Sequence, residues 1–402
     1  MAIVSDLFVL GFIILLGLAS QYIFKKTRIP DVLILIVFGA VLSAMGVANG
    51  VKAGGGWLTF LITFGLIYVV FYGALPIRLR AIFSTMKYAL MSSILNFIFV
   101  TSIIGVFGWL LGFGWILGFS LGALFCVMDG SIINALLETI KLSSKAKAQV
   151  QTESAVIDTF VIVAILSILN FARMTWSQVL TSLVGYLLLS FAIGLVAALI
   201  WSFALKRVGD YGSAPIATMA VLVMLYAFGE TVGANGAITV FSFAIILGNV
   251  GLISKLFNKN QEEGFHALDI STKSFFRDIS FLLRTFLFVY LGILVDFSAW
   301  GYLLIGLVFF LVAYVIRSFI GRMIMNKNLT KRENYYLDAM CAKGLTPTVM
   351  LAVINADAAF SNIVIGGIFS SIVVTSILLY LIEKDRFTTV SDWILAKVAK
   401  KA

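Results

Sequence analysis

Acidic residues lie near the middle of two strongly apolar stretches between residues 121 and 160. Asp129 falls in the first stretch, and Glu153 and Asp158 fall in the second. If both stretches cross a lipid bilayer, each ionised acid costs about 2.5 to 3.5 kcal/mol at the membrane centre. Charges are retained there for ion pathways, proton transfer or pairing with a base. We therefore expect the chemistry of this chain to lie in this region.

The positions of the two acids in the second stretch suggest different roles for them. Ser154 and Asp158 are four residues apart, so a helix places the hydroxyl beside the carboxylate. These oxygens, together with backbone carbonyls from an unwound neighbour, suit a small alkali cation, and a proton would compete for the same carboxylate. Glu153 lies about 100° around the helix from Ser154. We expect it to form a structural ion pair with Arg317 or Arg284, and such a pair is also an alternative for Asp158.

Two of the apolar stretches contain helix-breaking residues at their centres. The first reads Met-Asp-Gly-Ser at residues 128–131, and the second reads Lys-Gly-Leu-Thr-Pro at residues 343–347. Glycine weakens a helix and proline removes a backbone donor, so both stretches are predicted to be discontinuous helices. The alternative is that these residues only kink ordinary membrane helices.

Each predicted break also contains a charge, and the two charges are opposite in sign. Asp129 would compensate the positive ends of the half-helices, and Lys343 would compensate the negative ends. The two broken stretches are seven spans apart, so they run through the membrane in opposite directions. That arrangement is typical of inverted repeats whose broken helices cross at the midplane.

The composition indicates a polytopic membrane protein. The chain has 402 residues, of which 61% are hydrophobic and 12% are charged, whereas soluble domains have about 25% charged residues. A net charge of +10 is compatible with basic cytoplasmic loops, and we expect no nucleic-acid partner. The two cysteines, Cys126 and Cys341, lie in apolar segments, so a disulfide is not expected. The single histidine, His266, is read as a loop residue.

Apolar runs bounded by charges, glycine or proline predict thirteen membrane spans. They are residues 6–24, 31–49, 57–75, 88–111, 115–138, 149–171, 179–205, 214–232, 236–254, 275–295, 301–324, 335–356 and 361–383. Most lysines and arginines fall in alternate loops, and the other loops hold only Lys52 and Arg173. The positive-inside rule then places the N-terminus outside and the C-terminus in the cytoplasm. Residues 384–402 form a short basic tail that we expect to be an amphipathic helix on the lipid surface.

In their order and span positions, several motifs resemble those of the monovalent cation/proton antiporter superfamily, on its NhaP/NHE-like side. The resemblance covers essentially the whole chain. It rests on Met128-Asp129-Gly130, Thr152-Glu153-Ser154, Ile157-Asp158, the run from Leu287 to Gly292, Arg317 and Ala342-Lys343-Gly344. Two of these depart from the family pattern, because Met128 and Ile157 stand where relatives have Thr and Asn. Arg284 stands where relatives often have Glu or Asn.

The resemblance implies an all-α protein of the NhaA-like antiporter fold, with thirteen transmembrane helices and no cofactor or enzymatic activity. Residues 1–383 would form the membrane domain. Spans 1–3 and 8–10 would make the dimerisation part of a homodimer, and spans 4–6 and 11–13 the transport core. The protein is expected in a prokaryotic cell membrane.

The resemblance also assigns roles to the candidate residues. Asp158 would be the exchange site, where Na⁺ or K⁺ is the bound metal ion and H⁺ its competitor. Ser154, the backbone of Met128 and Asp129 would help to bind the cation, while Glu153 would pair with Arg317.

The function predicted is exchange of Na⁺, or of Li⁺ or K⁺, for H⁺. Because Ile157 replaces the first acid of the acid pair found in electrogenic relatives, one exchanged charge on one carboxylate suggests electroneutral transport. A K⁺/H⁺ antiporter, a symporter for an organic anion on the same fold, and a channel or non-transporting sensor are the alternatives.

Overall fold

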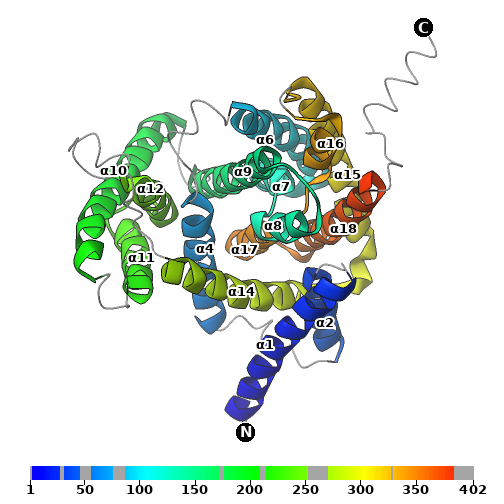
Figure 1. Cartoon of the computed structure of the whole chain (residues 1–402), viewed down its shortest axis with the longest axis horizontal. Coiled ribbons are helices and arrows are strands. Elements are labelled where there is room, and N and C mark those ends of the chain that lie inside the picture. The colour runs from blue at the N-terminus through cyan, green and yellow to red at the C-terminus, as the bar shows by residue number, and fades with distance from the viewer. Residues whose placement is uncertain are drawn as a thin grey trace. The chain divides into compact units, whose positions relative to one another are not determined.

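The computed structural model describes residues 2–27, 31–45, 56–75, 87–171, 176–208, 214–251, 270–326 and 329–383. Every regular element in these ranges is a helix (Figure 1), which satisfies backbone hydrogen bonds inside each segment, as lipid requires. The elements are α1 Ala2–Thr27, α2 Asp31–Ala44, α4 Gly56–Ala74, α6 Lys87–Gly108, the π-helical turn η1 Trp109–Phe113, α7 Gly114–Cys126, α8 Gly130–Thr139, α9 Ser144–Phe171, α10 Trp176–Val208, α11 Ala214–Thr231, α12 Gly236–Gly248, α14 Ile270–Ile293, the 3₁₀ turn η3 Phe297–Ala299, α15 Trp300–Met323, α16 Lys331–Ala339, α17 Leu345–Ile354 and α18 Ala358–Glu383.

The helices agree with the expected spans to within a few residues. Each of the thirteen expected ranges contains helix, and the all-α prediction is confirmed for the described residues. Within the described ranges, six helical stretches are long and apolar enough to cross a membrane by length and composition. The number of crossings and the inverted-repeat relationship remain predictions. The proposed tail at 384–402 and the loop with His266 lie outside the described residues.

The chain forms two compact units. Unit 1 comprises Met1–Ile62, Tyr88–Val161 and Leu282–Ala402, and unit 2 comprises Thr63–Lys87 and Ile162–Phe281. Every residue that the sequence analysis places at the ion site or in its ion pairs belongs to unit 1. The division into dimerisation and transport parts is a separate prediction.

Within unit 1, α15 and α18 approach each other closely enough for their backbones to touch. Gly306 on α15 faces the carbonyl oxygen of Ile363, and Gly366 on α18 faces that of Leu303, so a Cβ at either glycine would overlap a carbonyl. Small residues allow such close helix packing in membranes. This contact fixes α15, the helix that carries Arg317.

Gly306→Ala is therefore expected to destabilise the protein by about 1 to 3 kcal/mol, as overpacking of a tight core does. The measurement is the unfolding temperature of the purified protein in detergent. Gly301→Ala, on the same helix but with open space at its Cβ position, is the matched control and should be neutral or slightly stabilising, since alanine favours helix. Equal effects of the two substitutions would contradict this packing.

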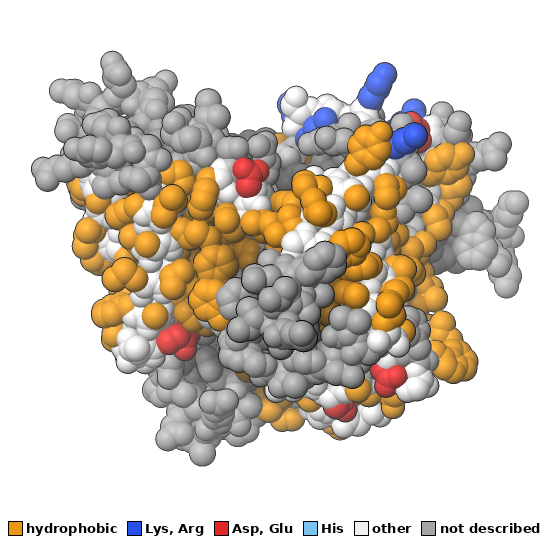
Figure 2. Space-filling view, turned by 90° about the horizontal axis from the view of Figure 1, so that it is seen from below, with side chains coloured by type: hydrophobic (Ala, Val, Ile, Leu, Met, Phe, Trp, Pro, Cys, Tyr) orange, Lys and Arg blue, Asp and Glu red, His pale blue; other side chains and the backbone are white. Residues whose placement is uncertain are grey.

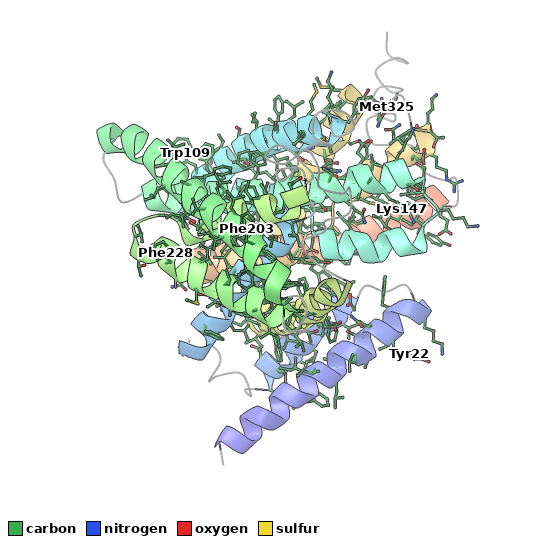
Figure 3. The ribbon with its side chains drawn as sticks, turned by 60° about the vertical axis from the view of Figure 1, so that its left-hand side comes forward. Tyr22, Trp109, Lys147, Phe203, Phe228 and Met325 are labelled. Atoms are coloured by element: carbon green, nitrogen blue, oxygen red, sulfur yellow. The ribbon has the colours of Figure 1, made fainter. Side chains whose placement is uncertain are left out.

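Unit 2 is held together by aromatic contacts and by one very close helix pair. Phe71 on α4 packs against Phe243 on α12 and Phe276 on α14. Gly194 lets α10 lie directly against α12. Phe203 on α10 and Phe228 on α11 are 69% and 54% exposed (Figure 3). Large exposed apolar side chains of this kind are expected on helices that face lipid.

The described surface is mostly apolar. On the face drawn in Figure 2, hydrophobic side chains make up most of the described atoms, and the visible lysines and arginines lie near the upper edge. Basic side chains at the edge of an apolar surface fit a membrane protein whose charges stay in water.

A capping box begins α16. The hydroxyl of Thr330 accepts a hydrogen bond from the backbone N–H of Glu333 at 3.2 Å, and Glu333 Oε2 accepts one from the backbone N–H of Thr330 at 2.9 Å. The backbone N–H of Ser143 donates to Glu333 Oε1 at 3.1 Å, which ties the α8–α9 loop to α16. These bonds, first those from Ser143 and then those from Thr330, lower the pKa of Glu333 to about 2.

The stabilisation by Glu333 should depend on pH in a defined direction. The pKa of an unfolded glutamate is about 4.3, so the contribution is complete above that value and is lost as pH falls through the folded-state pKa of about 2. Glu333→Gln should lower the unfolding temperature at neutral pH. The difference from the unmodified protein should vanish towards about pH 2, and a difference that persists there would disprove the role of the charge.

Candidate ion-binding site

Both predicted helix breaks are present, and they touch each other. α7 ends at Cys126, the backbone is extended at Val127 (φ −56°, ψ 146°), and α8 begins at Gly130. Residues 340–344 separate α16 from α17. The backbone N–H of Asp129 donates to the carbonyl of Ala342 at 2.8 Å. The two interruptions therefore meet, and the alternative of merely kinked helices is wrong.

Asp129 connects the first turns of both half-helices. Its Oδ1 accepts a hydrogen bond from the backbone N–H of Ile132 in α8 at 3.0 Å, and its Oδ2 accepts one from the backbone N–H of Leu345 in α17. The residue is 2% exposed. A carboxylate in this position offsets the positive ends of two helices. Because both oxygens already accept hydrogen bonds, the geometry favours this positioning role for Asp129 over that of a cation ligand.

Lys343 has the complementary position at the end of α7. Its Nζ donates to the carbonyl oxygens of Phe125 at 2.5 Å and Val127 at 3.1 Å. Its backbone N–H donates to Ser371 Oγ on α18 at 2.8 Å. A cation at a helix C-terminus offsets the negative end of that helix. Together Lys343 and Asp129 hold the crossing in one arrangement.

Asp158 lies on α9 beside this crossing. The backbone amide of Gly130 and the hydroxyl of Thr346 both lie near its carboxyl group. The side chain of Ser154, one helical turn earlier, packs against Gly130, where a Cβ would lie 3.1 Å from Ser154 Oγ. Parts of α8, α9 and α17 thus converge at the Asp158 carboxyl.

The carboxyl of Asp158 is open to a ligand. The residue is partly exposed, but its Oδ1 is buried and has no hydrogen-bond partner among the described residues. Within the same part of the chain, no Lys or Arg lies at ion-pair distance from it. Thr346 Oγ1 is also buried without a hydrogen bond in the described structure. Unpaired buried oxygens of this kind are suited to bind a cation or a proton.

Thr346 was not singled out as a site residue by the sequence, although it lies in the predicted break. The sequence does not show whether a threonine hydroxyl faces the site or bonds to its own helix. The hydroxyl of the neighbouring Thr348, for example, donates to the carbonyl of Gly344 at 2.7 Å within its own helix. A threonine in an apolar helix often satisfies itself in this way. Only the structure separates the threonine that faces Asp158 from the one that does not.

Glu153 and Arg317 form a buried ion pair. Arg317 Nη1 lies 2.7 Å from Glu153 Oε1, and Nη2 donates to the carbonyl of Leu337 at 3.0 Å. Ser92 Oγ donates to the same Glu153 oxygen at 2.6 Å. Glu153 and Arg317 are 2% and 7% exposed. The network joins α6, α9, α15 and α16, and the structure thus brings together the pair that the sequence suggested.

Arg284 does not belong to this network, and its suggested pairing with Glu153 is wrong. Its Nη2 lies 2.9 Å from Asp31 Oδ2, at the start of α2. The reason is the contact between α2 and α14, where Gly39 and Gly292 let the two backbones touch. That approach brings Arg284 to Asp31, a buried acid that needs a base.

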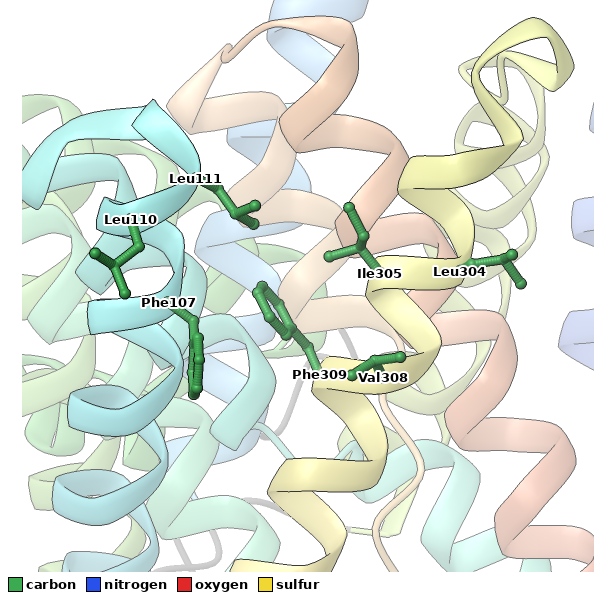
Figure 4. A pocket seen from close by; sticks show the side chains of 7 residues that line it. All are labelled: Phe107, Leu110, Leu111, Leu304, Ile305, Val308 and Phe309. Carbon is green, nitrogen blue, oxygen red and sulfur yellow. The ribbon is translucent and has the colours of Figure 1, made fainter.

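Two of the hollows lined by described residues of unit 1 differ in polarity. The larger is a groove of about 370 Å³ between the end of α6 and α15 (Figure 4). Its lining is entirely apolar and consists of Phe107, Leu110, Leu111, Leu304, Ile305, Val308 and Phe309. A lining without polar groups gives a cation no ligand, so the groove is not part of the ion site. The smaller is a polar cavity beside Glu153 and Arg317.

Neither cysteine takes part in the site. Cys126 and Cys341 are both buried and form no disulfide with each other. Met128 is buried at the break in the fifth span, with 2% of its surface exposed, and Ile157 is 1% exposed beside Asp158. Both apolar replacements are therefore packed into the core around the site.

One comparison with known proteins shows the family of this chain, and another shows the fold that it shares with solved structures. The family model described as "Sodium/hydrogen exchanger, transmembrane" matches residues 11–382. No curated protein sequence matches the chain. Two solved structures of the sodium proton antiporter MjNhaP1 from Methanocaldococcus jannaschii are similar in fold. The one at pH 8 has a TM-score of 0.74 and 19% identity, and the match covers 96% of this chain and 98% of that chain. The one from electron microscopy has a TM-score of 0.71 and 19% identity, with 97% and 100% covered. The family match spans both interrupted helices and Asp158, and we conclude that the chain belongs to the sodium/hydrogen exchanger family.

Proposed function

We propose that this protein is a secondary antiporter that exchanges Na⁺ for H⁺ across the cell membrane by alternating access. The observation that carries the proposal is the Asp158 carboxyl, which lies beside the crossing of two interrupted helices and has no base paired with it among the described residues. Membership of the sodium/hydrogen exchanger family supports it.

The cation site would combine Asp158 with neighbouring neutral oxygens. Ser154 and Thr346 supply hydroxyls, and the unwound backbone at Met128 supplies carbonyl oxygen. Hard oxygen ligands of this kind suit alkali cations. Asp129 and Lys343 would keep the two half-helices in place rather than bind the ion.

Exchange follows from competition at one carboxylate. An unpaired carboxylate in a low-dielectric site is costly, so Asp158 holds a proton or a cation and exchanges one for the other. Each cycle then moves one positive charge in each direction. Because Ile157 offers no second carboxylate, the exchange is electroneutral.

The test is transport in proteoliposomes that contain a pH-sensitive dye. Outward proton gradients should dissipate on addition of NaCl, at a rate that does not change when a membrane potential is imposed with a potassium ionophore. A potential that by itself drives cation-coupled proton movement would exclude electroneutral exchange. Current far faster than carrier turnover would indicate a channel, and no flux with any salt would indicate a sensor.

A K⁺/H⁺ antiporter is the second candidate, because one feature of the site favours it. The buried Met128 and Ile157 leave fewer polar ligands, and K⁺ loses its hydration shell more readily than Na⁺. Parallel dye assays with the chlorides of Na⁺, Li⁺ and K⁺ decide between them. An organic-anion symporter would respond to none of these chlorides but would respond to the salt of an organic anion, which a sensor would not.

Thr346→Val should weaken cation binding without affecting the fold. Loss of one ligand is expected to raise the cation concentration for half-maximal exchange about tenfold, which corresponds to ~1.4 kcal/mol. Thr348→Val is the matched control, because its hydroxyl bonds to Gly344 in its own helix. If Thr346→Val and Thr348→Val leave the half-maximal concentration equally unchanged, Thr346 is not a ligand.

The assembly and orientation are part of the proposal. Spans 1–3 and 8–10 would form the interface of a homodimer, with the N-terminus outside and the C-terminus in the cytoplasm. Cysteine cross-linking in membranes and labelling of engineered loop cysteines from either side test these points.

A further inference from the structure

One stripe of residues on α18 lies against both interrupted helices, and the proposed exchange gives it no role. Gly367, Ser371 and Thr375 are buried and follow one another at intervals of four residues, so they share one face of the helix. α18 contacts both α7 and α17, and all of these elements belong to unit 1. At Gly367 a Cβ would overlap the ring of Phe125, so the glycine leaves the space that this ring fills beside the end of α7.

The two hydroxyls of the stripe contact the other break, at residues 340–344. Ser371 Oγ accepts a hydrogen bond from the backbone N–H of Lys343 at 2.8 Å. Thr375 Oγ1 lies 3.5 Å from the Sγ atom of Cys341. Ser371 and Thr375 are completely buried, so water does not compete for these contacts. One face of α18 therefore supports the unwound backbone between α16 and α17.

The hydroxyl of Ser371 is fixed by two hydrogen bonds. It donates to the carbonyl of Ile368 in its own helix at 2.7 Å, which leaves the lone pairs of Oγ to accept the N–H of Lys343. Lys343 lies between two helices, so its backbone N–H has no acceptor inside a helix, and Ser371 supplies one. A buried backbone N–H without an acceptor is costly. Alanine at position 371 would leave this N–H free to move towards another acceptor.

The backbone that Ser371 holds leads directly to the ion site. Thr346 follows Lys343 by three residues, and its hydroxyl lies near the Asp158 carboxyl. Asp129 holds the same segment through hydrogen bonds to residues on either side of Lys343. The position of Thr346 relative to Asp158 therefore depends on two anchors, Asp129 at the crossing and Ser371 on α18. Cation ligands must keep their geometry closely, so a shift of this backbone weakens binding.

We propose that Ser371 is a positioning residue for cation binding, which sets the affinity of the Asp158 site by fixing the Lys343 backbone from α18. Ser371 does not touch the ion. The inference rests on the proposed exchange at Asp158. Because Asp129 still holds the segment when the Ser371 hydroxyl is removed, the protein should fold, but with a less exact arrangement of cation ligands.

The test is exchange by full-length Ser371→Ala in dye-loaded proteoliposomes, titrated separately with NaCl and KCl. For the salt that the unmodified protein exchanges, the half-maximal concentration should rise roughly fivefold to tenfold, as expected when one buried hydrogen bond no longer orders the ligands. The maximal rate per folded protein should change much less. A purely structural role would give the opposite result, because it reduces the amount of active protein and leaves the half-maximal concentration unchanged.

Ser376→Ala is the matched control on the same helix. The hydroxyl of Ser376 donates to the carbonyl of Ile372 within α18 at 2.8 Å, and this variant should have the half-maximal concentration of the unmodified protein. An unchanged half-maximal concentration in Ser371→Ala, an equal rise in Ser376→Ala, or failure of Ser371→Ala to fold would overturn the positioning role alone. Absence of exchange in the unmodified protein would instead overturn the proposed function, and the positioning role with it.

Discussion

Replacing Asp158 with asparagine is expected to abolish cation/proton exchange while the protein still folds. Asparagine has the same shape but binds neither a proton nor a cation with a counter-charge, so both steps of the cycle are lost together. Dye-loaded proteoliposomes should show a rate at the background of empty vesicles. The folded yield should not fall, because the substitution removes a carboxylate that has no base beside it among the described residues.

Asp357→Asn provides the matched control for this experiment. It makes the same chemical change at an exposed helix cap, and exchange should be unaffected. Exchange above background in Asp158→Asn would move the ion site elsewhere, whereas loss of the folded protein would assign Asp158 a structural role.

Glu153→Gln is expected to damage folding rather than ion exchange. It would leave Arg317, which is 7% exposed, buried without a carboxylate. Breaking a buried ion pair costs about 3 to 5 kcal/mol, because the remaining charge is uncompensated. Ser92 would also lose its carboxylate acceptor. The unfolding temperature and the folded yield should both drop, and the fraction that folds should still exchange cations.

A double substitution separates the pair from its individual members. Replacing Glu153 and Arg317 together with methionine removes both charges, and such replacements are often neutral or stabilising. The double variant should therefore be more stable than Glu153→Gln. A double variant that is less stable than the single one would show that the charges do not act as a pair.

The breaks and the Glu153–Arg317 pair could be predicted from the sequence because apolar surroundings leave few alternatives. A charge in a membrane helix needs a partner, and Glu153 and Arg317 are both internal to predicted spans. Glycine and proline beside charges in the fifth and twelfth spans similarly predicted interrupted helices. In these cases the alternatives are an unpaired charge in lipid or a continuous helix through glycine and proline. Both cost so much free energy that the sequence indicates the structure.

The partner of Arg284 could not be predicted in the same way. Asp31 is the first residue of its span, and an acid in that position is usually interpreted as a solvated helix cap. Its pairing depends on the contact of α2 with α14 through Gly39 and Gly292. Backbone contact between distant segments leaves no local pattern in the sequence.

The hydroxyls around the site were missed for another reason. Ser92 and Thr346 are small polar residues in apolar helices, where a hydroxyl can bond to its own backbone. Ser92 instead bonds to Glu153, and Thr346 faces Asp158. Asp129 was assigned two roles, and only the two backbone N–H groups at its oxygens favour the capping role.

Competition between Na⁺ and H⁺ at Asp158 can be measured as the release of protons when Na⁺ binds. Purified protein in weakly buffered detergent solution, with a pH indicator present, would be titrated with NaCl. Because a ligand must lose its proton to bind a metal ion, we expect proton release in the unmodified protein and in Asp357→Asn, and none in Asp158→Asn. Undiminished release from Asp158→Asn would contradict the claim that cation and proton compete for this carboxylate.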